Sequence, residues 1–231
     1  MSFYFGVLMR NLVAIATDRT RVEYPGPVVT SNGPRYYRPF QSQIQNQDFV
    51  IVPAGFLFVS LKIAEIMYAL GNDNGTFKIE NVLLKKEQFQ NRASSFFAEM
   101  KAKHGGKGEL SFNSDTLFAG IGFLGSVSSR KNFQLQVLNK PGYIVLNQPP
   151  EILSRVTKSI KLYLDTAFNL PIEVQKSLAK KTFPQIMGYV HEKGHMVSPS
   201  GDLIFIGPEV VEAFEYGKES EQPRKRVTDE T

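Results

Sequence analysis

The stretch that decides the predicted fold is EILSRVTKSIKLYLDTA, residues 151–167. Six of its apolar residues form a stripe at positions 152, 156, 160, 163, 164 and 167. This spacing of three or four residues is typical of a helix with one buried face. Pro149 and Pro150 precede the stretch and Asn169-Leu170-Pro171 ends it. The chain before these prolines has strand character, so residue 149 marks a predicted change from strands to helices.

Two more helices are predicted after this one, from Pro171 to about Lys181 and from Pro184 to Lys193, because proline is tolerated at the first helical position. A hairpin from Met196 to Ile206 follows, turning at 198–201, and then a short helix over 208–216. Three helices and a hairpin also match a winged helix-turn-helix, in which the third helix enters a groove of nucleic acid. Ordinary helix packing beside a hairpin is the alternative interpretation.

The part before residue 149 predicts strands over 3–30, 49–52 and 109–148, interrupted by one long amphipathic helix over 80–103. Asn139-Lys140-Pro141-Gly142 predicts a hairpin connection between strands 133–138 and 143–146. The predicted fold class is therefore α+β: a β-rich part, 1–148, then a mostly helical part with a hairpin, 149–217. Whether the two are one domain stays open, and the polar segment 218–231 is expected to be a disordered tail.

Composition excludes some functions. The 231 residues contain no cysteine, which excludes disulfides, thiolate nucleophiles and cysteine-bound zinc. Residues 1–207 carry a net charge of +8 and residues 208–231 of −3, and a basic body favours an anionic partner or simply reflects a lysine-rich surface. A secretory signal has a basic region before its apolar stretch, but here the first cation, Arg10, comes after the apolar stretch, so no secretory signal is predicted. No stretch is long and apolar enough for a membrane span, and the expected location is the cytoplasm or a virion.

The string His191-Glu192-Lys193-Gly194-His195 fits the HExxH zinc-protease pattern. In that geometry the two histidines bind zinc from one helical turn and the glutamate is the general base. Gly194 breaks the helix that this requires, since glycine commonly ends helices. The sequence therefore favours a helix end with no metal or cofactor, and a zinc-dependent hydrolase that uses His191, His195 and Glu192 is the alternative.

Cations interleaved with aromatic rings carry the favoured functional hypothesis. Such side chains can stack bases and hold phosphates, or pack on a neighbouring subunit. The candidate contact residues are Arg35, Tyr36, Tyr37, Arg38, Phe40, Arg130, Lys131, Lys180 and Lys181. No strong catalytic signature accompanies them. We therefore expect a non-enzymatic structural or assembly subunit that contacts nucleic acid or neighbouring subunits, such as a virus or phage structural component or a nucleoprotein, and that forms a homo-oligomer or part of a larger complex.

Overall fold

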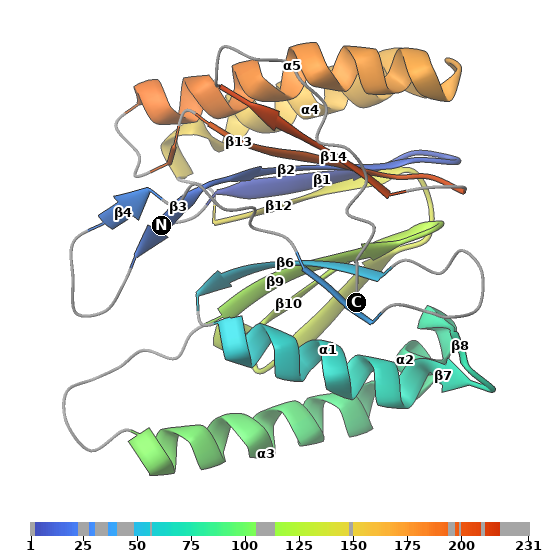
Figure 1. The fold of residues 1–231 in the computed structure, drawn as a ribbon, viewed down its shortest axis with the longest axis vertical. Coiled ribbons are helices and arrows are strands. Elements are labelled where there is room, and N and C mark those ends of the chain that lie inside the picture. The colour runs from blue at the N-terminus through green and yellow to red at the C-terminus, as the bar shows by residue number, and fades with distance from the viewer. Residues whose placement is uncertain are drawn as a thin grey trace, which may run out of the picture.

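The chain folds into four layers, in which two antiparallel sheets face each other and helices cover both outer faces (Figure 1). The computed structural model describes residues 3–22, 28–30, 37–40, 49–55, 57–104, 114–147, 150–193, 197–198, 200–208 and 211–217. Each sheet has one face toward the other sheet and one toward helices. Both faces are therefore buried, which explains why the strands read as nearly continuous apolar runs.

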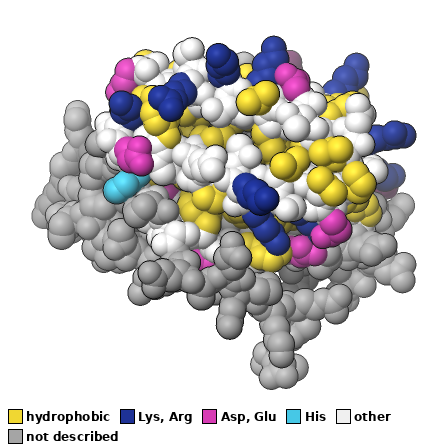
Figure 2. All heavy atoms as spheres, turned by 90° about the horizontal axis from the view of Figure 1, so that it is seen from above, with side chains coloured by type: hydrophobic (Ala, Val, Ile, Leu, Met, Phe, Trp, Pro, Cys, Tyr) yellow, Lys and Arg dark blue, Asp and Glu magenta, His cyan; other side chains and the backbone are white. Residues whose placement is uncertain are grey.

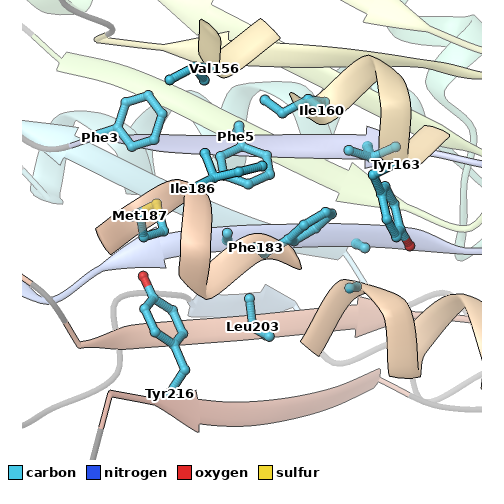
Figure 3. Packing of buried hydrophobic residues seen from close by; sticks show 14 of the residues in the cluster. Phe3, Phe5, Val156, Ile160, Tyr163, Phe183, Ile186, Met187, Leu203 and Tyr216 are labelled. Carbon is cyan, nitrogen blue, oxygen red and sulfur yellow. The ribbon is translucent and has the colours of Figure 1, made fainter. Parts of the chain in front are cut away.

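The first sheet joins strands from both ends of the chain. Every neighbouring pair in it is antiparallel. Its order is β12 (Gly142–Leu146), β1 (Tyr4–Leu8), β2 (Val13–Asp18), β13 (Gly201–Ile206) and β14 (Val211–Tyr216). Helices α4 (Leu153–Ala167) and α5 (Ile172–Glu192) cover its outer face. The Phe183 ring of α5 packs edge-on against Phe5 of β1 and Tyr163 of α4 (Figure 3).

The second sheet lies below the first in Figure 1. Its order is β11 (Gln134–Leu138), β10 (Phe123–Ser128), β9 (Ser114–Gly120), β6 (Phe49–Gly55) and β5 (Tyr37–Phe40). Its outer face carries α1 (Leu57–Gly71), α2 (Ile79–Leu84) and α3 (Lys86–His104). The remaining short elements are β3 (Thr20–Val22), β4 (Val28–Thr30), β7 (Asn72–Asp73), β8 (Thr76–Phe77) and the 3₁₀ turns η1 (Ser129–Lys131) and η2 (Pro150–Ile152).

The two sheets touch through an apolar layer that includes Ile15, Leu117, Leu124 and Ile204. A Cβ on Gly6 would lie 2.8 Å from Leu124 Cδ1, so a side chain at this position would push the sheets apart. Glycine is required here for close approach rather than for an unusual backbone angle. The sandwich is therefore held by packing between sheets as well as under the helices.

The predicted fold class is wrong. Helices and strands are not segregated along the chain, because β13 and β14 from the C-terminal part complete the sheet of β1 and β2, while three helices lie in the N-terminal part. The predicted 133–146 hairpin is also wrong: β11 pairs with β10, whereas β12 pairs with β1 in the other sheet. Residues 139–141 therefore carry the chain from one sheet to the other. A turn-forming sequence gives the local bend but not the partner of the next strand.

Other element predictions differ in boundary or type. The predicted helix over 80–103 is two helices, α2 and α3, separated at Lys85. The two helices predicted over 171–193 are one helix, α5, which contains Pro184 in its interior. Buried Phe183, Ile186 and Met187 pack that segment onto the first sheet, and this packing outweighs the hydrogen bond that proline removes. Residues 211–216 form strand β14, not a helix.

Candidate functional site

A row of polar residues crosses four strands at one end of the first sheet. The register aligns Tyr4 of β1 with Thr17 of β2, Thr17 with Asp202 of β13, and Asp202 with Glu215 of β14. Residues in one row of a sheet share a face. The apolar neighbours two residues along, including Ile15, belong to the layer between the sheets. The row therefore lies at the end of the inter-sheet layer.

Arg19, directly after β2, binds two carboxylates of this row. Its Nε donates to Asp202 Oδ2 (3.1 Å) and its Nη2 to Asp202 Oδ1 (2.5 Å), while Nη1 lies 2.7 Å from Glu215 Oε1. The side chains of Arg19, Asp202 and Glu215 are 2%, 4% and 12% exposed. Burial alone would lower the pKa of Arg19, but the hydrogen bonds and charges of the two carboxylates outweigh it and raise that pKa. Arg19 therefore stays charged and clamps three strands together.

Asp18 and Tyr216 lie beside this clamp. Asp18 is the last residue of β2, is fully buried, and follows Thr17, whose carbonyl accepts a hydrogen bond from the Tyr216 hydroxyl (3.2 Å). Burial raises the pKa of Tyr216 well above its usual value, and the negative charges of Asp18 and Asp202 raise it further. Three carboxylates and one guanidinium thus meet at this end of the sheet. Buried charges of this kind are expensive and cluster at functional sites.

The second sheet contributes a network of hydroxyl groups. Ser60 of α1 bonds Ser114 (2.7 Å) and accepts a hydrogen bond from Thr116 (2.8 Å), both of β9. The Ser129 hydroxyl accepts from the Ser114 amide (2.9 Å). The hydroxyl of Tyr4 donates to the carbonyl of Asp115 across the inter-sheet layer (2.6 Å). This bond connects the hydroxyl network to the polar row, so both sheets place polar groups at the same end of the sandwich.

The sequence-predicted contact residues that the structure describes lie on separate elements. Arg35 and Tyr36 lie outside the described residues, while Tyr37, Arg38 and Phe40 belong to the edge strand β5. Arg130 and Lys131 are exposed in η1, which connects β10 and β11 of the second sheet. Lys180 and Lys181 are exposed on α5, which covers the first sheet, and the Lys180 ammonium lies 3.6 Å from the Phe214 ring. The basic and aromatic segments are thus spread over different layers.

The helix that the zinc-protease alternative requires ends before the second histidine of its motif. Helix α5 ends at Glu192 with Lys193 as its C-cap, so the HEKGH segment is not one continuous helix. His191 Nδ1 bonds the Val197 carbonyl (2.7 Å), and His195 lies outside the described residues. Among the described residues, no group of three or more histidine or acidic side chains could hold a metal ion.

The row of Thr17, Asp202 and Glu215, with Asp18 and Arg19, was missed by the sequence analysis. Residues 18 and 202 are 184 positions apart, and local spacing cannot report such a contact. One signal was present: Asp18-Arg19 and Gly201-Asp202 each place charges at the end of an otherwise apolar strand. Charged residues at the ends of neighbouring buried strands are candidates for one site.

The fold and this end-of-sheet site define the class: a four-layered sandwich of two antiparallel sheets between two layers of helices, with buried charges at the end where β1 begins. No protein-family model and no curated protein matches the sequence. Solved structures with this fold do match. The Anbu complex of Pseudomonas aeruginosa, described as a helical assembly, superposes with a TM-score of 0.58 at 13% identity over 94% of this chain and 88% of its own.

Two further structures agree. Anbu from Yersinia bercovieri, described as an ancestral beta-subunit, gives a TM-score of 0.54 at 15% identity, covering 91% of this chain and 86% of that one. HslV from Trypanosoma brucei gives 0.50 at 10% identity, covering 89% and 99%. These similarities, together with the single helix α5, overturn the prediction of a nucleic-acid-binding virus or phage component or nucleoprotein. The winged-helix order behind that prediction does not exist. No described helix is long and apolar enough to cross a membrane.

Proposed function

We propose that this chain is a subunit of a homo-oligomeric, proteasome-like peptidase. The observation that carries the proposal is the four-layered sandwich, which matches the Anbu complex of Pseudomonas aeruginosa over 94% of the chain with a TM-score of 0.58. That relative is described as a helical assembly. The proposal has a peptide substrate where the sequence analysis expected a nucleic-acid partner, and it keeps the expected homo-oligomer.

The proposed site is the end of the sandwich where β1 begins. Peptidases with an N-terminal nucleophile use the hydroxyl of their first residue to attack the peptide carbonyl carbon, while the free α-amine of that residue takes the hydroxyl proton. The amine then gives the proton to the leaving amine of the peptide, and water hydrolyses the ester that remains. Ser2 is the hydroxyl residue next to Phe3 in sequence and lies outside the described residues. The proposal requires Ser2 to be the first residue of the mature chain.

Asp18 is the charged group best suited to support this chemistry. It ends β2, the strand that pairs with β1, and its carboxylate is buried. A carboxylate beside the start of β1 would stabilise the ammonium that forms when the α-amine takes a proton. In this proposal Arg19 and Asp202 hold the end of β2 in place and do not touch the substrate.

Peptide hydrolysis by the purified, assembled protein tests the proposal. Wild-type protein should cleave unfolded casein or fluorogenic peptides, with Ser2 found as the first residue by intact mass. Ser2→Ala should lose this activity at least a hundredfold, while Ser177→Ala, at an exposed position on α5, should keep it. An assembled wild-type protein with Ser2 first and no hydrolysis of any substrate would refute the peptidase. A monomer in light scattering at tens of micromolar would refute the assembly.

A further inference from the structure

A cavity lies at the end of the first sheet that is farther from the polar row. It is lined by the turn between β1 and β2 and by the connection from α4 to α5. Its volume is about 280 Å³, close to the smallest sites that bind small molecules. Six of its lining residues are Arg10, Asn11, Phe168, Leu170, Ile172 and Gln175. The cavity therefore has room for one small ligand and is separate from the proposed peptidase site.

One buried polar atom of a lining residue lacks a hydrogen-bond partner. Gln175 of α5 is 4% exposed, and its Nε2 donates to the carbonyls of Ala167 (3.1 Å) and Leu170 (2.9 Å). These two bonds fix the orientation of the amide, since turning it over would oppose Oε1 to two carbonyl oxygens. Oε1 accepts no hydrogen bond from the described residues. A buried acceptor without a donor is unfavourable, so this atom indicates a donor from outside the chain.

The same cavity attracts negative charge. Arg10 is exposed in the turn after β1, and no carboxylate of the described residues forms an ion pair with it. Helix α5 begins beside the cavity at Ile172, and the first amides of a helix have no partner within it and carry a partial positive charge. The acidic side chain of this first turn, Glu173, accepts a hydrogen bond from Lys176 Nζ (3.0 Å). An anionic group in the cavity would therefore meet a guanidinium and a helix N-terminus.

The rest of the lining is largely apolar. Phe168 and Leu170 are 38% and 36% exposed, and Ile172 is half-buried. Figure 2 looks onto the layer of α4 and α5 and shows hydrophobic side chains gathered on one side of this face. A ligand that matches the whole cavity has an anionic group, a nearby N–H donor and an apolar part. A plain carboxylic acid would leave Gln175 Oε1 without a donor, whereas an α-amino acid carries its carboxylate and its ammonium on one carbon atom.

We propose that this cavity binds a free apolar α-amino acid such as leucine. Its carboxylate contacts Arg10 and the N-terminus of α5, and its ammonium donates to Gln175 Oε1. Its side chain lies against Phe168 and Leu170. Binding depends neither on the proposed peptidase activity nor on the homo-oligomer, and peptide hydrolysis enters none of the measurements below, so each proposal can fail without the other.

Isothermal titration calorimetry of the full chain with L-leucine tests the chemistry of the site. Wild-type protein should bind leucine with saturation, one molecule per chain. Leucinamide lacks the carboxylate and isocaproate lacks the amine, so each should bind at least about tenfold more weakly, because each loses charge-assisted hydrogen bonds. An absence of saturable leucine binding would refute the proposal. Isocaproate that binds as tightly as leucine would refute the contact between the ammonium and Gln175 Oε1.

Two pairs of variants test the location. Arg10→Ala should raise the dissociation constant of leucine at least about tenfold, while Arg92→Ala, at an exposed position on α3 in the opposite helical layer, should leave it unchanged. The chain has no tryptophan, so Phe168→Trp places a single indole at the cavity, and leucine should change its emission. Leu84→Trp on α2 should not respond. Leucine binding that Arg10→Ala leaves intact, or that Phe168→Trp does not report, would place the ligand elsewhere and overturn the site.

Discussion

Removing the Asp202 carboxylate tests whether the buried clamp around Arg19 stabilises the first sheet. Asp202→Ala would leave Arg19, whose side chain is 2% exposed, with Glu215 as the clamp's remaining carboxylate. Deleting one partner of a buried ion pair costs about 3–5 kcal/mol, because the other charge stays buried. We expect the lower end, about 3 kcal/mol, since Glu215 Oε1 remains 2.7 Å from Arg19 Nη1.

Urea denaturation followed by far-ultraviolet circular dichroism measures this cost, since the chain has no tryptophan to serve as a fluorescent probe. With a denaturant slope of about 2–3 kcal/mol per molar, a loss of about 3 kcal/mol lowers the midpoint by about 1–1.5 M. The matched control is Glu99→Gln, which removes an exposed ion pair to Lys103 (2.6 Å) and should leave the midpoint unchanged. A midpoint for Asp202→Ala within error of wild type would show that the clamp does not hold the strands.

Three further predictions concern the same sheet. Gly201→Ala should lower the free energy of unfolding by about 1–3 kcal/mol, because a Cβ at Gly201 would overlap the Thr17 carbonyl and the Tyr216 ring. Gly188→Ala should raise the free energy of unfolding by about 0.5–1 kcal/mol, because Gly188 lies inside α5 with open space around it. Thermal unfolding compares the two variants. The pKa of Tyr216 is raised in the folded state, so its contribution to stability is present below about pH 10 and is lost as the pH rises further. Tyr216→Phe should therefore flatten the fall of the urea midpoint between about pH 9 and 11. An equally steep fall in the variant would contradict this. Tyr4→Phe should cost about 1–2 kcal/mol, since it leaves the buried Asp115 carbonyl without the Tyr4 hydroxyl, and a neutral result in urea would exclude that bond as a link between the sheets.

The sequence predicts local structure well where one helix face or one strand is enough to define it. The apolar spacing of residues 152–167 corresponds to α4, and the run at 49–52 lies in β6. The sequence does not predict the structure of a segment whose conformation depends on the strand or helix it packs against. Residues 211–216 are a strand because β14 pairs with β13, and six residues are too few for their periodicity to decide. Likewise, Pro184 reads as a helix start, but tertiary packing of Phe183 and Met187 keeps α5 continuous.

The candidate site was hidden from the sequence for a related reason. Its residues come from β1, β2, β13 and β14, and only the register of the sheet places Tyr4, Thr17, Asp202 and Glu215 in one row. The basic and aromatic segments were conspicuous because their residues are adjacent in sequence. Adjacent exposed charges report a solvated surface at least as often as a site, and in this chain they lie on several different layers.

The buried clamp also bears on why this end of the sandwich is a better candidate for function than any other. An arginine and two carboxylates removed from water stabilise a fold no better than apolar side chains of the same size would. The rest of the inter-sheet layer is built from such apolar residues, including Ile15 and Ile204, two positions along the same strands from Thr17 and Asp202. Among the described residues of this layer, the buried clamp of Arg19, Asp202 and Glu215 lies where β1 begins. That cost in stability is consistent with a site at which Asp18 must be held in a fixed place, and it favours this end of the sheet for the proposed peptidase chemistry.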